Sequence, residues 1–136
     1  GMYKELIMGK MPMLPQFAMN LSDVRDVAAI HVAALENDKA NGHRFIVATE
    51  KAHKVAEMAE ILKENGYSKV STRLAPNFLL RFMARFDNNL KGMLPFIGNT
   101  FNGDIGETLK TFNWKPTPLE KTVLDTAKSV EEAMNK

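Results

Sequence analysis

The sequence predicts an α/β fold with a parallel βαβ crossover, and three observations support this prediction. Residues 17–21, 45–48 and 70–72 predict short strands: the first segment alternates loosely, and the second is an apolar run with β-branched residues. The segments between them, residues 23–37 and 52–65, have apolar residues at helical spacing. Because strand, helix, strand, helix and strand alternate along the chain, we expect parallel pairing through crossover helices.

Length and composition predict one globular domain over residues 1–136, with ordinary hydrophobic and charged content. The chain has no cysteine, which excludes disulfides, cysteine nucleophiles and cysteine-ligated zinc and fits a cytoplasmic location. The apolar runs are too short for a membrane helix, so we expect no membrane partner. The net charge is only +2 and no basic run occurs, so we expect no nucleic-acid partner. Gly1 before Met2 is interpreted as a scar left by tag cleavage.

The N-terminal segment is predicted to hold a short helix, a loop and a strand. Residues 2–8 are apolar-rich and predict a helix that ends at Gly9. Pro12 and Pro15 prevent a continuous helix in the segment that follows. The loosely alternating residues 17–21 then predict the first strand.

The two central helices have clear start and stop signals. Ser22 and Asp23 are both favoured N-cap residues, and the first helix is expected to follow them. Gly66 is placed for the left-handed C-cap of the second helix. The expected apolar faces consist of Val27, Ile30, His31, Ala34 and Leu35 in the first helix, and of Val55, Met58, Ala59 and Leu62 in the second.

Three more helices are predicted towards the C-terminus. The first begins at Pro76, and its apolar face consists of Phe78, Leu79, Phe82, Met83 and Phe86. The second covers residues 105–111, with Asp104 as its cap. The last covers residues 118–134, where Thr117, Pro118 and Glu120 have the spacing of a capping box.

The common catalytic and cofactor motifs do not occur in this sequence. Gly98 and Gly103 have the spacing of a P-loop, but Asp104 stands where lysine is required and would repel phosphate. The sequence contains no G-x-G-x-x-G turn, no Tyr-x-x-x-Lys pair, no His-Glu-x-x-His and no G-x-S-x-G. We therefore expect no catalytic, cofactor-binding or metal-binding residues in this chain.

Asp23, Asp26 and His31 are close enough in sequence to be tested as metal ligands. Carboxylates at the start of a helix are more often caps and favourable partners of the helix dipole. His31 falls on the apolar side of its helix and is expected to be packed and hydrogen-bonded. His43 and His53 are expected at the surface.

Two apolar sets fit either a core or a binding site. Phe78, Phe82 and Phe86 share one helix face, which is typical of a core but also fits a pocket or a dimer face. The loop that contains Met11 and Met13 fits packing against the sheet or substrate lining, since methionine adapts to irregular ligands. The candidate substrate-pocket residues are Met11, Met13, Leu14, Phe17, Phe78 and Phe82.

Several segments together resemble one known family. Gly9–Pro15 is similar to its Gly-x-Met-Pro-x-x-Pro loop, and Ser22–Ala34 to its V-D-V-R-D-V-A-x-x-H-x-x-A segment. Gly42–Val47 resembles its G-x-R-F-I strand entry, and Phe112–Pro116 with Thr126–Val130 resembles its closing L-G-W-x-P and T-A-x-S-L. The family is the extended short-chain dehydrogenase/reductases, in the NAD-dependent epimerase/dehydratase group near dihydroflavonol reductase-like ketone reductases. Asn113 replaces the family's glycine, and asparagine tolerates a left-handed cap.

The resemblance covers only the C-terminal part of that family, and it implies a partial Rossmann-like sheet, the late βαβ portion, with a helical substrate lobe. Family members reduce ketones or aldehydes with NAD or NADP, using a glycine-rich half and a Tyr-x-x-x-Lys set that this sequence does not contain. The expected protein is therefore a truncated one that keeps the substrate-binding lobe, binds no cofactor by itself and is inactive alone.

The expected partners are a carbonyl substrate and either a second copy, pairing through an exposed sheet edge, or a separate chain with the Rossmann half. A different interpretation is a non-catalytic small-molecule-binding or interaction module that works as a homodimer. A third is an inert remnant of an enzyme gene.

Overall fold

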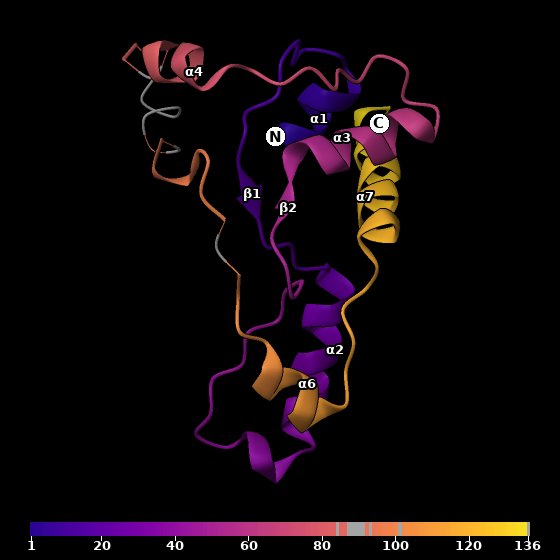
Figure 1. Cartoon of the computed structure of the whole chain (residues 1–136). Coiled ribbons are helices and arrows are strands. Elements are labelled where there is room, and N and C mark those ends of the chain that lie inside the picture. Colours follow the sequence, from indigo (N-terminus) through magenta and orange to yellow (C-terminus); the bar gives the residue numbers. More distant parts are fainter. Residues whose placement is uncertain (84, 87–91, 93, 101, 136) are drawn as a thin grey trace.

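The computed structural model describes residues 1–83, 85–86, 92, 94–100 and 102–135. The fold is mixed α/β, with helices gathered at both ends of an elongated molecule and two short strands between them (Figure 1). The α-helices are α1 (Met2–Ile7), α2 (Val24–Leu35), α3 (Val55–Glu64), α4 (Asn77–Met83), α6 (Gly106–Phe112) and α7 (Leu119–Met134). The strands are β1 (Ala18–Met19) and β2 (His53–Lys54), and the 3-10 helices are η1 (Asp38–Ala40) and η2 (Leu94–Phe96).

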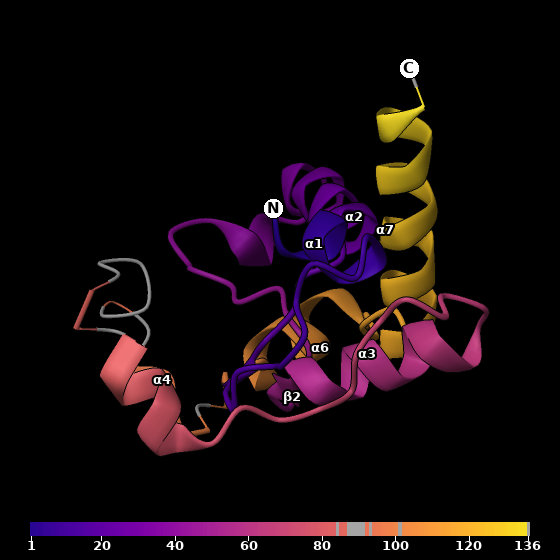
Figure 2. The same cartoon turned by 90° about the horizontal axis from the view of Figure 1, so that it is seen from above.

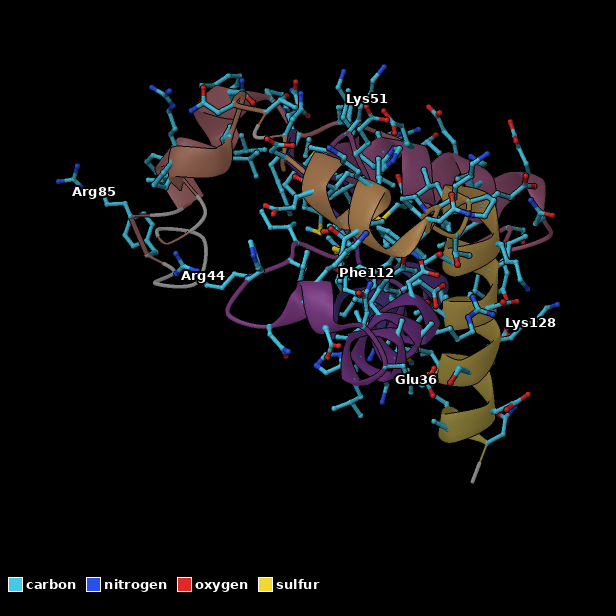
Figure 3. All side chains as sticks on the ribbon, turned by 90° about the horizontal axis from the view of Figure 1, so that it is seen from below. Glu36, Arg44, Lys51, Arg85, Phe112 and Lys128 are labelled. Carbon is cyan, nitrogen blue, oxygen red and sulfur yellow. The ribbon has the colours of Figure 1, made fainter. Side chains whose placement is uncertain are left out.

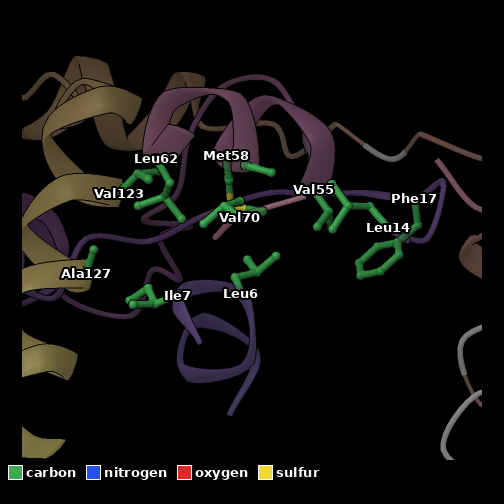
Figure 4. Close-up of a cluster of buried hydrophobic side chains, with 11 residues drawn as sticks. Leu6, Ile7, Leu14, Phe17, Val55, Met58, Leu62, Val70, Val123 and Ala127 are labelled. Atoms are coloured by element: carbon green, nitrogen blue, oxygen red, sulfur yellow. The ribbon is translucent and has the colours of Figure 1, made fainter. Parts of the chain in front are cut away.

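The main core lies where α1, α3 and α7 meet (Figure 4). Helix α3 contributes four buried residues to this core, because its apolar residues recur on one face, as the sequence predicts. Burying one such side chain stabilises the fold by about 1.5–3 kcal/mol relative to leaving it exposed. The buried members are Leu6, Ile7, Leu14, Phe17, Val55, Met58, Ala59, Leu62, Val70, Val123 and Ala127.

The ends of the N-terminal helices follow local signals. Gly66 has a φ of 95°, and the N–H of Tyr67 donates to the carbonyl of Leu62 over 3.1 Å. This is the Schellman arrangement that glycine permits, so the predicted C-cap of α3 is confirmed. Helix α1 likewise ends before Gly9, whose φ is 69°.

The sheet is smaller than predicted and has the opposite direction of pairing. The strands β1 and β2 pair antiparallel, with Ala18 opposite Lys54 and Met19 opposite His53. The predicted strands at 45–48 and 70–72 are wrong, since neither segment forms a ladder. Within the described residues, the expected parallel βαβ crossover is reduced to one isolated parallel bridge between Leu14 and Leu74.

The segment 45–48 is not a strand because side chains, rather than a neighbouring strand, bind its carbonyl groups. The Thr108 hydroxyl donates to the carbonyl of Ile46 over 2.7 Å, and the Ser22 hydroxyl donates to that of Val47 over 2.6 Å. Phe45 lies edge-on against Phe112, with ring centroids 4.7 Å apart. The apolar run therefore packs against α6 without a sheet.

Of the two predicted N-cap residues of α2, Asp23 takes that position, but the helix buries a different face from the predicted one. Asp23 accepts a hydrogen bond from the N–H of Arg25 over 2.9 Å, which confirms the cap. Ile30 is buried, whereas His31 and Leu35, both predicted on the buried stripe, are exposed. The prediction of a packed His31 is therefore wrong, although its Nδ1 lies 2.7 Å from the carbonyl oxygen of Val27.

The predicted capping box of α7 is also wrong. The helix begins at Leu119, and Pro118 is its N-cap residue with no side-chain hydrogen bond. Thr117 instead bonds to Asp26, its N–H and its hydroxyl each donating to one carboxylate oxygen over 2.8 Å. This contact ties the loop before α7 to the first turn of α2. By contrast, Asn113 holds the expected left-handed cap of α6, with a φ of 47°.

Helix α4 lies away from the main core, as the two views agree (Figures 1 and 2). Its phenylalanines Phe78 and Phe82 are 75% and 63% exposed, and Phe86 is exposed as well. The core interpretation of this phenylalanine face is therefore wrong. Leu80 is buried instead, in a small cluster with Ala75 and Ile97. The side chain of Met83 lies outside the described residues.

Candidate functional site

A hollow of about 290 Å³ lies beside the strand pair and is the candidate site. Its wall is built by residues 15–18 of β1 and the loop before it, by Lys54 and Ala56 at the start of α3, by Leu74, and by residues 98–100. The volume is close to the lower end of the range for small-molecule pockets, about 300 Å³. The hollow therefore has room for a small ligand.

Hydrogen bonds from or to Gln16 and Phe17 hold three other segments of the chain around this hollow. The N–H of Gly98 donates to the carbonyl of Gln16 over 3.0 Å, and the N–H of Val55 donates to that of Phe17 over 3.3 Å. The Gln16 amide donates to the carbonyl of Ala75 over 2.9 Å. Residues 98–100 and the start of α3 are thus fixed to the same short stretch of chain.

The wall offers both polar and apolar groups to a ligand. Among the described residues that line the hollow, Lys54 is the one ionisable side chain. Asn99 and Thr100 add neutral polar groups, and Phe17 with Leu74 adds apolar surface. An ammonium group and an amide N–H can donate to a carbonyl or carboxylate oxygen, while the apolar wall can hold a short hydrocarbon part.

The structure brings together some of the sequence-predicted pocket residues and separates others. Phe17 lines the hollow, and Leu14 is fully buried in the main core with Met11 packed against that core. Met13 is exposed on the loop. Phe78 and Phe82 lie on α4 and are not among the described residues that line the hollow.

A second polar arrangement joins α2 to α7. Asp23 is buried and accepts two hydrogen bonds from the Arg25 guanidinium, over 2.8 Å from Nε and 2.7 Å from Nη2. Its Oδ2 also accepts from the Thr122 hydroxyl over 2.8 Å. Arg25 Nη1 reaches Asp125 Oδ2 over 2.6 Å, and Lys121 Nζ reaches the same oxygen over 2.8 Å.

Ionisation in this cluster follows from its hydrogen bonds. The Arg25 side chain holds the pKa of Asp23 well below its usual range, against the opposing effect of burial. Asp23 and then Asp125 raise the pKa of Arg25. Lys121 and then Arg25 lower the pKa of Asp125. The cluster is therefore charged at neutral pH and links two helices, with each of these charges matched by an opposite one.

The candidate metal ligands take structural roles. Asp23 caps α2 and binds Arg25, while Asp26 binds Thr117, so their oxygens already have donors. Across the described residues, no group of three or more His, Cys, Asp or Glu side chains could hold a metal ion. His43 lies at the surface beside Glu107, as predicted, and the half-buried His53 contacts Glu57 over 2.9 Å.

Sequence reasoning missed several residues of the hollow. No sequence pattern marks Lys54 as a binding residue, because a single lysine before a helix is common in proteins. Residues 98–100 end the segment 87–100, for which the sequence predicts irregular structure or a short helix, and only the glycine at position 98, whose φ is 79°, could have indicated a turn there. Their position beside Gln16 depends on contacts between segments about 80 residues apart, which local patterns do not report.

The fold and the hollow define a small mixed α/β protein with room for a small ligand. Comparison with known protein families, with curated proteins and with solved structures finds no match for this chain. None of the helices in the described part of the chain has the length and apolar character needed to cross a membrane.

Proposed function

We propose that this chain is the substrate-binding part of a protein similar to the extended short-chain dehydrogenase/reductases, and that the hollow beside β1 binds a small carbonyl compound. The observation that carries the proposal is the position of the hollow. The loop that resembles the family's Gly-x-Met-Pro-x-x-Pro motif ends at Pro15, and Pro15 with the next three residues forms one wall.

The chemistry of the wall supports the same ligand class. The Lys54 ammonium and the Asn99 amide can donate to a carbonyl oxygen, and Phe17 provides apolar contact for the carbon skeleton. In this proposal α4 with residues 94–100 is the helical substrate lobe. The chain binds no NAD or NADP by itself and reduces nothing alone, because the glycine-rich turn and the Tyr-x-x-x-Lys set are not in its sequence.

The proposed binding of a carbonyl compound in the hollow is tested by saturation-transfer NMR with two ketones, acetophenone and cyclohexanone. We expect a saturable signal for at least one of them in the unmodified chain. Lys54→Gln should weaken binding about fivefold to tenfold, because a charge-assisted hydrogen bond becomes at best a neutral one. Lys51→Gln is the matched control, since Lys51 is an exposed lysine outside the hollow and should leave binding unchanged.

Two results of the ketone experiment would contradict the proposal. Absence of any ketone signal, or equal weakening by both lysine variants, would remove the hollow as a carbonyl site. NADPH fluorescence is titrated separately on the unmodified chain. Saturable binding of one NADPH per chain would contradict the proposal that the cofactor site is missing.

A non-catalytic interaction module that works as a homodimer is the second candidate function. It is favoured by one specific observation: two apolar side chains of α2, Val24 and Leu35, are 78% and 89% exposed.

A further inference from the structure

Helix α4 turns its phenylalanines away from the protein. Phe78 is 75% exposed, Phe82 is 63% exposed, and Phe86, just beyond the helix, is 79% exposed. Leu80 is two positions from both Phe78 and Phe82, which places it on the opposite side of the helix. Because Leu80 is buried in the small cluster described above, it fixes the orientation of α4 with the phenylalanines outward.

Phe78, Phe82 and Phe86, here called the phenylalanine patch, form one apolar surface. Phe82 and Phe86 contact each other edge to face, with ring centroids 5.6 Å apart and an interplanar angle of 67°. Phe78 is one helical turn before Phe82 and lies on the same face. Since α4 lies away from the main core, a projecting part of the molecule presents the patch (Figures 1 and 2). Exposed patches of large apolar side chains mark surfaces that contact another molecule.

The patch lies in the most basic part of the sequence. Between Glu64 and Asp87 the chain has no acidic residue and four basic ones, Lys69, Arg73, Arg81 and Arg85. This segment carries more positive charge than the whole chain, whose net charge is +2. Arg81 and Arg85 are exposed, each directly before or after a patch residue, and Arg85 points outward from the molecule (Figure 3). The surface around the patch therefore attracts anionic partners.

The size of the patch argues against a stable protein partner. A phenylalanine side chain can bury about 150–250 Å², so at these exposures the patch offers roughly 300–500 Å². A standard protein interface needs about 800 Å² per partner. A membrane surface needs less, because its mobile lipids adapt to a small patch and no complementary shape is required.

Phenylalanines beside arginines have the chemistry of a surface that lies on a membrane. The rings enter the boundary between headgroups and acyl chains, while arginine side chains extend to the lipid phosphates. On an anionic membrane, each basic residue near the surface adds roughly fivefold in affinity. Nucleic-acid bases would instead require ring faces free for stacking, whereas Phe82 and Phe86 pack against each other edge to face.

From exposure, area and charge we infer that the phenylalanine patch, with Arg81 and Arg85, docks on a membrane surface that contains anionic lipids. The inference does not rest on the carbonyl site. A surface that lies on a membrane needs no spanning helix, so the short apolar runs of the sequence do not bear on it. Because the patch is small, binding is reversible and weakens with salt.

The first test is co-sedimentation with vesicles of phosphatidylcholine alone or with added phosphatidylserine. The unmodified chain should bind the phosphatidylserine vesicles at least about tenfold more tightly. Phe78→Asp should weaken this binding about tenfold or more, because a carboxylate cannot enter the apolar boundary. Val24→Asp is the matched control, since Val24 is equally exposed on α2 and the charge change is the same, and it should leave binding nearly unchanged.

The contribution of charge is tested with two pairs of substitutions. Arg81→Gln with Arg85→Gln should weaken binding to phosphatidylserine vesicles about twentyfold, at roughly fivefold for each arginine. Lys51→Gln with Lys63→Gln removes the same charge at exposed positions outside α4 and should have a much smaller effect. Equal weakening by the two pairs would mean attraction by net charge alone and would contradict the assigned surface.

A second test reports which part of the protein touches the lipid. The sequence has no cysteine, so Phe86→Cys and Val24→Cys each carry a single thiol for a polarity-sensitive fluorophore. With phosphatidylserine vesicles the emission should shift to shorter wavelength at position 86 and stay unchanged at position 24. Equal shifts at both positions would contradict docking through the patch.

The unmodified chain also decides between this partner and others. No binding to phosphatidylserine vesicles at millimolar lipid would overturn the inference. If sedimentation velocity then showed a dimer that Phe78→Asp dissociates, the patch would be an interface between two copies. If the chain instead bound a single-stranded oligonucleotide and Phe78→Asp abolished that binding, the patch would be a nucleic-acid surface.

Discussion

At the scale of single residues, Asp23 links local structure to tertiary structure. Its carboxylate accepts the N–H of Arg25 as an N-cap, binds the guanidinium of the same residue, and accepts the hydroxyl of Thr122 from α7. A buried carboxylate needs such partners, since an unpaired buried charge strongly destabilises a fold. The cap residue of α2 therefore also fixes the position of α7.

Replacing Asp23 with Asn tests this role. The amide can still cap the helix, but it loses the ion pair with Arg25, so we expect the free energy of unfolding at pH 7 to fall by about 2 kcal/mol. Urea denaturation measures the change. Glu50→Gln, at an exposed acid, is the control and should change stability by less than about 0.5 kcal/mol.

The pH dependence of the same variant gives an independent readout. Because Arg25 holds the pKa of Asp23 below its usual range, the contribution of Asp23 is fully present above about pH 4, near the pKa of an unfolded aspartate. It is lost as the pH falls from there towards the lowered pKa of the folded state. The stability difference between the unmodified chain and Asp23→Asn should therefore shrink below about pH 4. A difference that stays constant from about pH 7 to about pH 3 would contradict this assignment.

At the scale of elements, periodicity and helix ends locate the helices, and tertiary contacts decide which face is buried. In α3 the predicted face, including Met58 and Leu62, is fully buried under α1 and α7. In α2 the sequence offers apolar residues on all sides, so periodicity alone cannot choose between them. The structure buries Ile30 and exposes Leu35, and α6 packs against α2.

Two leucine-to-alanine variants measure this difference between helices. Leu62→Ala should lower the free energy of unfolding by about 2–5 kcal/mol, because it leaves a cavity in the main core. Leu35→Ala, at the exposed position of α2, should change it by less than about 0.5 kcal/mol when the protein is dilute. Both are measured by denaturant unfolding at low protein concentration. A cost at Leu35 equal to that at Leu62 would contradict the placement of α2.

At the scale of the whole molecule, the described residues include two separate clusters of buried apolar side chains, which differ in size. The main core joins α1, α3 and α7, whereas Ala75, Leu80 and Ile97 form a small cluster that holds α4 near η2. The number of buried contacts sets the local stability of a segment. The α4 region should therefore open more readily than the main core.

Amide hydrogen exchange of Leu80→Ala tests whether the two clusters unfold separately. The N–H groups of Leu80, Ile97 and Gly98 are hydrogen-bonded in the small cluster or beside it, and they should exchange faster in the variant. The amides of Met58 and Val123 in the main core should keep their protection. Uniform acceleration at all these sites would mean that the molecule opens as one cooperative unit.

The sequence by itself determined the helices that have their own local signals. Asp23 caps the start of α2 through a bond to Arg25, Gly66 ends α3 within bonds that span at most five positions, and Asn113 adopts its left-handed cap in the same local way. Such interactions can be read from neighbouring residues. For the candidate site, the same reasoning named Phe17 but not Lys54 or residues 98–100, which come from other parts of the chain.

Only the tertiary structure decided the direction of strand pairing, the partner of Thr117, the exposure of the phenylalanines on α4 and the exposed side of α2. Thr117 has the right spacing for a cap, yet Asp26, 91 residues away, takes both its N–H and its hydroxyl. The apolar run at 45–48 has the composition of a strand, yet the Ser22 and Thr108 side chains bind its carbonyls. The physical reason is the same in each case. Which donor, acceptor or apolar face a group contacts depends on residues that are distant in sequence and close in space, and local spacing along the chain does not indicate which residues these are.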